Sequence, residues 1–229
     1  MPARARKRLK GIRMSSLDLF AEERYGQCDA IGPRAFVLHR YALPVVDELL
    51  RAVAAVEKQA PFRNMTTPGG YTMSVALTNC GALGWTTDRD GYRYTSIDPD
   101  TGRSWPAMPE VFARLARNAA AAAGFDAFEP DACLLNRYLP GSRMSLHQDK
   151  DEADFSAPIV SVSLGMAATF LFGGKRRSDK PVKVPLYHGD VVVWGGEDRL
   201  RYHGVMPMKD DPHPVLGSKR INFTFRKAA

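Results

Sequence analysis

The sequence predicts a mainly β protein with flanking helices, in the α+β class, whose strands form a two-sheet barrel or jelly roll. From residue 132 onward, short runs of β-branched and aromatic residues alternate with turn residues, a spacing that is typical of such barrels. Both stretches with helical periodicity come earlier in the chain, so we expect the helices to cover the outside of one sheet. The mouth of a barrel brings side chains from several strands together, and a functional site is expected there.

The composition is ordinary for one globular domain, with 229 residues of which 45% are hydrophobic and 25% charged. The three cysteines are odd in number and far apart, which argues against a disulfide framework and favours a reducing compartment. No apolar run is long enough to span a membrane, and no secretory signal is visible. We therefore expect a cytoplasmic protein without a membrane partner, and we expect it to be a monomer.

The net charge of +7 is concentrated at the N-terminus. Residues 1–13 contain six Lys and Arg and no acid, so that removing these six leaves a net charge of about +1. We predict that residues 1–16 form a disordered basic tail and that residues 17–229 form a single domain. The simpler interpretation of the tail is a solubilising extension; the alternative is a weak attraction to phosphate backbones.

The first half of the domain contains one predicted strand and two predicted helices. Residues 35–39 form the strand after a short lead-in. Apolar residues recur at helical spacing over 44–58, with Pro44 near the start, and predict the first helix. Pro109 opens a second helix over 109–123, which an alanine run fills and a glycine ends. We expect both helices to pack against a sheet.

Between the helices, residues 62–106 differ from the rest of the chain in being rich in Gly, Thr, Asp and aromatic residues. The aromatic side chains are Tyr71, Trp85, Tyr92, Tyr94 and Trp105. Strand-like alternation is short there, as in 71–78. Such a segment is typical of a lid over a site; the alternative is a surface hairpin region whose aromatics pack on the core.

The second half of the chain contains a succession of predicted strands. Their sequences are CLLNRYL, PIVSVSL, ATFLF, VPLYHGDVVVW and INFTFR. Within the fourth run, His188-Gly189-Asp190 separates two strand-like pieces, and a turn is the simplest interpretation of these three residues.

A set of candidate metal ligands lies in this second half. His147 and Asp149 are two residues apart, so that on a strand both point to the same side. Such a triplet alone is weak evidence, but a distal His203 is available from a later strand. Two histidines and one carboxylate can occupy one face of an octahedral Fe(II) and leave positions open for a 2-oxo acid and oxygen.

The closing segment 220–226 alternates in character. One face carries Arg220, Asn222, Thr224 and Arg226, and the other carries Ile221, Phe223 and Phe225. The apolar face is expected to meet the core. The polar face is either a solvated surface or the lining of a barrel, where its arginines would require anions such as the two carboxylates of a five-carbon diacid. Asn136 and Tyr138 likewise share one face and offer neutral hydrogen-bonding groups.

Taken together, the chain resembles the AlkB family of nucleic-acid repair dioxygenases and is close to its bacterial members. The resemblance runs from about residue 35 to residue 226, with a weaker match at 17–20. It is carried by the strings TPGGYTMSVALTNCGALGWTT, WPAMP, PDACLLNRYLPG, SLHQDKDE, PIVSVSLG, HGDVVVWGG and RINFTFR. The resemblance implies a double-stranded β-helix (a jelly roll) with a nucleotide-recognition lid, here over 62–106.

The resemblance also implies roles for individual residues. The implied Fe(II) ligands are His147, Asp149 and His203. Arg220, helped by Tyr138, would pair with the distal carboxylate of 2-oxoglutarate, while Arg226, Asn136 and Asn222 would hold its other end. Trp85 and His147 would sandwich a flipped base, Asp151 would favour its positive charge, and Tyr92 and Arg177 would contact the nucleic acid or the base. Leu77 replaces a methionine of the bacterial pattern in the pocket, which bears on lesion preference.

The function expected from the resemblance is oxidative demethylation of bases of the 1-methyladenine and 3-methylcytosine type. Fe(II), 2-oxoglutarate and O2 are the expected cofactor and co-substrates, and formaldehyde, succinate and CO2 the products. Single-stranded DNA is the main expected partner, with RNA and double-stranded DNA as further ones. Two alternatives are a dioxygenase that acts on another modified base or on a protein side chain, and a non-catalytic binder of damaged nucleic acid. The complete ligand set and the two arginines argue against the binder.

Overall fold

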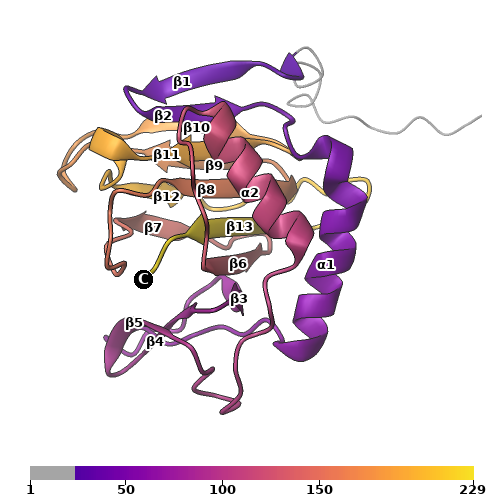
Figure 1. Cartoon of the computed structure of the whole chain (residues 1–229), viewed down its shortest axis with the longest axis vertical. Coiled ribbons are helices and arrows are strands. Elements are labelled where there is room, and N and C mark those ends of the chain that lie inside the picture. Colours follow the sequence, from indigo (N-terminus) through magenta and orange to yellow (C-terminus); the bar gives the residue numbers. More distant parts are fainter. Residues whose placement is uncertain (1–23) are drawn as a thin grey trace, which may run out of the picture.

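The computed structural model describes residues 24–229 (Figure 1). The predicted basic tail, residues 1–16, lies outside these residues. Among the helices in the described part of the chain, none combines the length and the apolar character that crossing a membrane requires.

Most of the strands belong to two facing sheets, which confirms the mainly β, jelly-roll prediction. The large sheet has seven strands, in the spatial order β1 (Cys28–Gly32), β2 (Ala35–Leu38), β11 (Val191–Trp194), β8 (Ile159–Gly165), β13 (Arg220–Arg226), β6 (Ala132–Tyr138) and β3 (Ala76–Gly81). The small sheet has four strands, in the order β10 (Val182–Leu186), β9 (Ala168–Phe172), β12 (His203–Val205) and β7 (Met144–His147). A buried apolar cluster with members from both sheets, including Val192, Trp194, Phe170 and Phe172, fills the space between them.

Two helices cover the outer face of the large sheet (Figure 1). A short 3-10 turn, η2 (Leu43–Val45), contains Pro44 and leads into α1 (Val46–Gln59), and α2 spans Glu110–Ala122. Both helices agree with the predicted positions to within two residues. The ring of Phe112 on α2 meets the ring of Phe223 on β13 edge-on, at a centroid distance of 4.8 Å. The apolar face of the closing strand therefore packs under the helices, as its alternation predicts.

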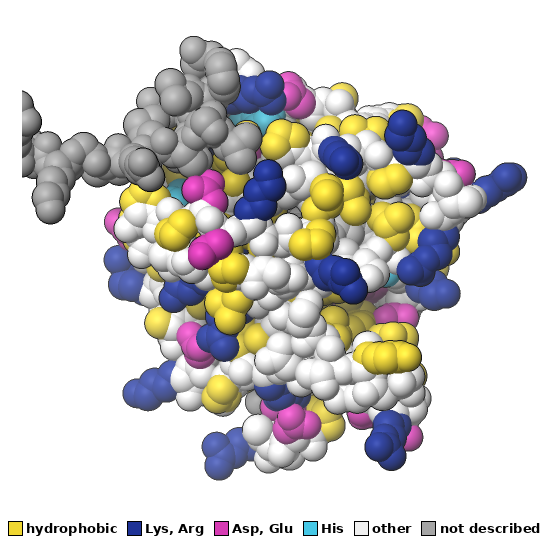
Figure 2. All heavy atoms as spheres, turned by 180° about the vertical axis from the view of Figure 1, so that it is seen from behind, with side chains coloured by type: hydrophobic (Ala, Val, Ile, Leu, Met, Phe, Trp, Pro, Cys, Tyr) yellow, Lys and Arg dark blue, Asp and Glu magenta, His cyan; other side chains and the backbone are white. Residues whose placement is uncertain are grey.

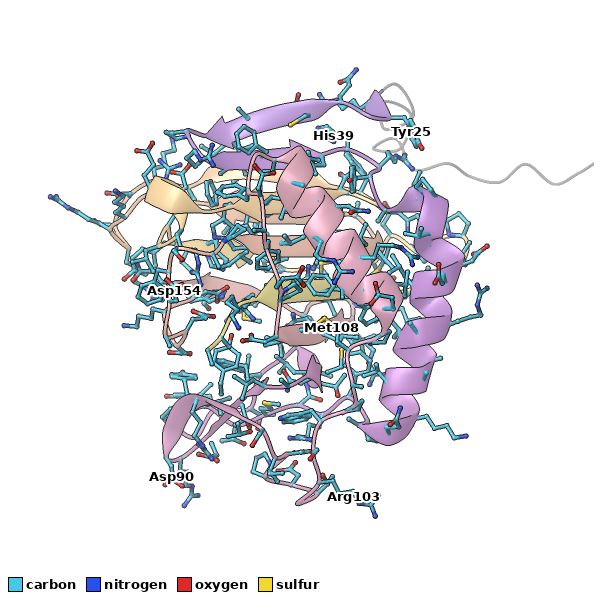
Figure 3. All side chains as sticks on the ribbon, viewed as in Figure 1. Tyr25, His39, Asp90, Arg103, Met108 and Asp154 are labelled. Carbon is cyan, nitrogen blue, oxygen red and sulfur yellow. The ribbon has the colours of Figure 1, made fainter. Side chains whose placement is uncertain are left out.

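The segment 62–106 divides between the large sheet and a separate hairpin. Its strand β3 pairs with β6, whereas β4 (Gly84–Asp88) and β5 (Gly91–Thr95) pair only with each other. The hairpin lies below the edge of the large sheet that β3 forms (Figure 1), and Asp90 in its turn points away from the two sheets (Figure 3). We call β4 and β5 the lid hairpin.

Within the two sheets, three strands lie outside the predicted strand runs, namely β1, β7 and β12. Of these, β1 and β7 are edge strands with one pairing partner, β2 and β12 respectively. The predicted turn at 188–190 is present, because Gly189 has a positive φ of 91° and the chain reverses between β10 and β11. A second 3-10 turn, η3 (Gly196–Asp198), follows β11.

Candidate metal centre and substrate cleft

His147, the last residue of β7, lies directly opposite His203, the first residue of β12, in the antiparallel pairing of these two strands. The Nε2 atom of His147 lies 3.6 Å from Oδ1 of Asp149, and that of His203 lies 3.6 Å from Oδ2. One ligand atom from each residue falls within 4.8 Å of the other two. The three predicted ligands are thus brought together at a spacing that suits a single metal ion.

Asp149 reaches this cluster in a different way from the one the sequence predicts. Simple alternation requires a strand that continues to residue 149, but β7 stops at His147. The side chain of Gln148 donates a hydrogen bond to the carbonyl of Leu200, at 2.6 Å, and this contact holds the chain where it leaves the sheet. Ion pairing with Arg226, rather than strand geometry, then orients the carboxylate.

The second nitrogen of each imidazole has a backbone partner. Nδ1 of His147 lies 2.9 Å from the carbonyl oxygen of Ser145, and Nδ1 of His203 lies 3.0 Å from that of Arg201. A carbonyl oxygen only accepts, so each Nδ1 carries a proton, and each Nε2, on the side of Asp149, is the nitrogen left for a metal ion. The donor set of two imidazoles and one carboxylate therefore fits Fe(II).

Arg226 holds the carboxylate of Asp149 from the side of the large sheet. Its Nε and Nη2 atoms donate to Oδ2 of Asp149, at 3.0 and 2.7 Å. Burial alone would raise the pKa of this carboxyl, but Arg226 and the two histidines outweigh it and hold the pKa well below its usual range. Asp149 is consequently ionised whenever the site is folded near neutral pH.

The metal-free protein is expected to lose stability as its pH falls, because of His147. The side chain is 38% exposed, but it faces the cleft, and burial, followed by the neighbouring His203, lowers its pKa to about 4. In the unfolded chain the value is about 6.5. Between these values the unfolded state binds the extra proton, so the free energy of unfolding decreases as pH falls from about 6.5 to about 4.

The variant His147→Gln lacks this titration and should gain stability relative to wild type over the same window. Urea unfolding in the presence of a chelator, at about pH 7 and about pH 5, measures the difference. A stability difference that is the same at both pH values would contradict the assignment.

Arg220 lies in an inner pocket between the sheets, next to the candidate metal ligands. It is 1% exposed; Nη2 donates to the hydroxyl of Ser163 at 2.9 Å, and the guanidinium carbon lies 4.9 Å from the ring centroid of Tyr138. Its Nε and Nη1 atoms have no hydrogen-bond partner within residues 24–229. A buried guanidinium with two free donors is well suited to a carboxylate, so the pocket fits one end of 2-oxoglutarate.

The remaining residues predicted to hold the co-substrate line the same pocket. Asn136 and Asn222 are register partners on β6 and β13, and the amide of Asn136 donates to the side-chain oxygen of Asn222 at 3.3 Å. The side-chain oxygen of Asn136 has no partner in the described part of the chain. His147, His203 and Arg226 line the pocket as well, so that it opens directly on the candidate metal centre.

A larger cleft, of about 820 Å³, lies on the other side of the metal ligands and runs out to the lid hairpin. All four residues predicted to bind the substrate line it: Trp85, Tyr92, Asp151 and Arg177. The rings of Trp85 and Tyr92 stack at 5.7 Å with an interplanar angle of 19°, and the indole N–H of Trp85 donates to Oδ2 of Asp151 at 2.8 Å. Leu77 is fully buried in an apolar cluster with Met65 and Leu134 at the floor of the cleft.

The lining of the cleft carries basic and acidic side chains together. Figure 2 shows the face opposite the helices, where Lys and Arg side chains are spread among hydrophobic ones. At the cleft itself, Arg143, Lys150 and Arg177 contribute to the lining. This distribution agrees with the weak net charge that the domain retains without its tail.

Sequence reasoning misses Glu152, Tyr94 and Arg199 as site residues. Glu152 belongs to the run DKDE, which reads as a solvated acidic stretch, yet its side chain is 1% exposed. Its carboxylate lies 3.2 Å from Arg199 and 3.2 Å from Arg226, and it accepts a hydrogen bond from the hydroxyl of Tyr94 at 2.8 Å. No periodicity in the sequence indicates this burial, because it depends on charges from distant strands.

Comparison with known proteins places the chain in a family. Residues 35–226 match the 2OG-Fe(II) oxygenase superfamily. The chain is 59% identical over 213 residues to the alpha-ketoglutarate-dependent dioxygenase AlkB of Salmonella typhimurium, which covers 93% of this chain and 98% of that protein. Its identity to AlkB of Escherichia coli is 56% over 212 residues, with the same coverage. The solved structure of OsALKBH1 superposes with a TM-score of 0.75 at 29% identity, covering 88% of this chain and 100% of that one.

The chain therefore belongs to the 2OG-Fe(II) oxygenase superfamily. Within it, the similarity to the AlkB dioxygenases extends over nearly the whole chain. The protein is accordingly a dioxygenase that uses Fe(II), 2-oxoglutarate and O2.

Proposed function

We propose that this dioxygenase removes methyl groups from bases of the 1-methyladenine and 3-methylcytosine type, in single-stranded DNA and in RNA. The observation that carries the proposal is the cleft that runs from His147 to the lid hairpin. It combines stacking rings, an acid and basic side chains in one concave surface. A mouse relative that is 35% identical over 132 residues is named a nucleic acid dioxygenase, which supports the same substrate class.

The chemical character of the cleft matches a flipped, positively charged base. A base removed from its strand needs aromatic surfaces on which to stack, and Trp85 with His147 would supply them. Methylation at N1 of adenine or N3 of cytosine leaves the base cationic, and the carboxylate of Asp151 at the rim would favour that charge. Tyr92 and Arg177 would contact the adjoining backbone.

The candidate ligands and the inner pocket define what the chain contributes to the reaction. His147, Asp149 and His203 would hold the metal, Arg220 and Tyr138 the distal carboxylate of 2-oxoglutarate, and Asn136, Asn222 and Arg226 would face its other end. When bound, iron with 2-oxoglutarate supplies the oxidation: one oxygen atom enters the N-methyl C–H bond, the other enters succinate, and CO2 is released. Formaldehyde then leaves from the hydroxylated methyl group, and the unmodified base remains.

Double-stranded DNA is a further proposed partner, because an aromatic cleft can receive a base flipped from a duplex at an added energetic cost. We also propose a cytoplasmic location. All three cysteines, Cys28, Cys80 and Cys133, are free, which suits a reducing compartment.

Charge selection by the cleft is tested with two oligonucleotides of equal mass. One carries 1-methyladenine, which is cationic, and the other carries N6-methyladenine, which is neutral; both are single-stranded. Mass spectrometry after incubation with Fe(II), 2-oxoglutarate and oxygen should show the loss of one methylene mass from the first and much slower loss from the second. Asp151→Asn should reduce this preference by roughly 10-fold or more, because a charge-assisted contact of about 1.5–3 kcal/mol is lost.

Demethylation of the neutral base in preference to the cationic one would overturn the proposed selectivity and favour another modified base as the substrate. Succinate formation without a mass change in either oligonucleotide would favour a substrate outside nucleic acids, such as a protein side chain. Double-stranded versions of both oligonucleotides extend the same assay to duplex DNA.

A further inference from the structure

The lid hairpin contacts the segment after the candidate metal ligands through a directly opposed pair of residues. Trp85 on β4 and Tyr94 on β5 are register partners. Trp85 donates to Oδ2 of Asp151 at 2.8 Å, and Tyr94 donates to Oε1 of Glu152 at 2.8 Å. The pair Trp85 and Tyr94 therefore joins the lid hairpin to the barrel through two hydrogen bonds. The acceptors are two neighbouring acids, Asp151 and Glu152.

The two acids differ in their surroundings. Asp151 is exposed at the cleft, where it has the role proposed above. The side chain of Glu152 is 1% exposed and lies between two buried arginines, with Oε2 at 3.2 Å from Arg199 and Oε1 at 3.2 Å from Arg226. Glu152 borders the cleft but is absent from the lining of the inner pocket, and its buried carboxylate lies against the arginines. We therefore look for its function in the two arginines that it contacts.

Both arginines that contact Glu152 also contact the candidate metal ligand Asp149. Arg226 donates to the carboxylate of Asp149 through Nε and Nη2, at 3.0 and 2.7 Å. Arg199 donates through Nη1 to the backbone oxygen of the same residue, at 2.8 Å. Through these two arginines, Glu152 fixes both the side chain and the backbone of Asp149.

We propose that Glu152 is a positioning residue that couples the seating of the lid hairpin to the geometry of the metal site, through Tyr94 on one side and Arg226 on the other. The inference rests on the proposed function of His147, Asp149 and His203 as ligands. Arg226 occupies Oδ2 of Asp149 and leaves Oδ1 as the less encumbered oxygen. When the lid hairpin lies against the barrel, the hydroxyl of Tyr94 donates a hydrogen bond to the carboxylate of Glu152. Arg226 then keeps the orientation in which it donates to Oδ2 of Asp149.

Loss of the Tyr94 hydroxyl is expected to disturb this arrangement from a distance. In Tyr94→Phe, Oε1 of Glu152 loses a donor and competes with Asp149 for Arg226, so that the ligand carboxylate is less firmly oriented. Replacing the outer partners of metal ligands typically weakens metal affinity by about 10- to 100-fold, and we expect a loss of roughly 10-fold here. Glu152→Gln should weaken affinity further, because it removes the charge between the two arginines.

The experiment uses Co(II), whose visible absorption reports on its coordination, added to the full-length metal-free protein. The matched control is Tyr92→Phe, which removes a hydroxyl from the same lid strand but at the cleft, and His147→Ala defines the site. The expected result is a weaker affinity and an altered spectrum for Tyr94→Phe, with values like those of wild type for Tyr92→Phe. With Fe(II), Tyr94→Phe should lower kcat while the KM for the oligonucleotide stays near that of wild type.

A Co(II) dissociation constant for Tyr94→Phe equal to or below that of wild type, with the same spectrum, would overturn the coupling. So would an effect confined to the KM for the oligonucleotide, which indicates a lid that only binds substrate. If wild-type protein bound Co(II) no better than His147→Ala, the ligand assignment itself would fail instead. The three results are distinct, and circular dichroism on each variant establishes that it is folded.

Discussion

Replacing Arg220 by alanine is expected to raise the KM for 2-oxoglutarate by roughly 30-fold to several thousandfold, equivalent to about 2–5 kcal/mol. The reason is the environment of the guanidinium, which is almost fully buried and keeps Nε and Nη1 without partners among residues 24–229. A carboxylate brought into the pocket of Arg220→Ala would be desolvated and have no counter-ion. Steady-state succinate formation at varied 2-oxoglutarate concentration measures the change.

The same substitution should not destabilise the protein in the absence of 2-oxoglutarate. Burial lowers the pKa of Arg220, which means that the cation is disfavoured in its pocket. We therefore expect the Tm of the Arg220→Ala protein without ligand to equal or exceed that of wild type, and the increase in Tm on adding 2-oxoglutarate to disappear. An unchanged KM, or a ligand-induced Tm shift as large as that of wild type, would contradict the role of Arg220.

In the variant Asp149→Asn, kcat is expected to fall by more than about 100-fold. This loss exceeds the loss of about 10- to 100-fold that is typical when a residue that only hydrogen-bonds to a metal ligand is replaced. The amide keeps the shape of the side chain but removes the negative charge that faces both histidines and Arg226. Co(II) titration and oligonucleotide demethylation measure the two consequences. Asp151→Asn is the matched control, because it changes a nearby acid that accepts from Trp85 and contacts neither histidine; it should retain metal binding.

Retention of metal affinity and turnover by Asp149→Asn would remove this residue from the ligand set. Loss of metal affinity in both variants would instead indicate that the negative charge of the whole segment, and not one carboxylate, attracts the metal.

The sequence predicts the fold well where burial follows a period of two or of 3.6 residues. In β13 the alternation separates Arg220 and Asn222 from Phe223, and the structure places the former in the inner pocket and the latter under α2. Both helices are marked by apolar periodicity and by a proline near the start. In contrast, β1 and β7 pair on one side only, and such edge strands carry a weaker pattern.

The candidate site is predictable as a set of residue types but not in its geometry. His147 and His203 become register partners only through the pairing of β7 with β12, 56 residues apart along the chain. Asp149 lies beyond its strand and is oriented by Arg226, a contact between segments 77 residues apart. Glu152 resembles a solvated acid in sequence, and its burial follows only from Arg199 and Arg226. Charge compensation of this kind is a property of the tertiary structure.

We propose that one site of this protein couples 2-oxoglutarate turnover to the demethylation of a base. The most direct measurement counts three quantities in one reaction: 1-methyladenine lost from a single-stranded oligonucleotide, formaldehyde released and succinate formed. Wild-type protein should give equal amounts of all three once the succinate formed without oligonucleotide is subtracted, and Asp149→Asn should give none. Succinate formed without loss of the methyl group, or methyl loss that persists in Asp149→Asn, would contradict the claim.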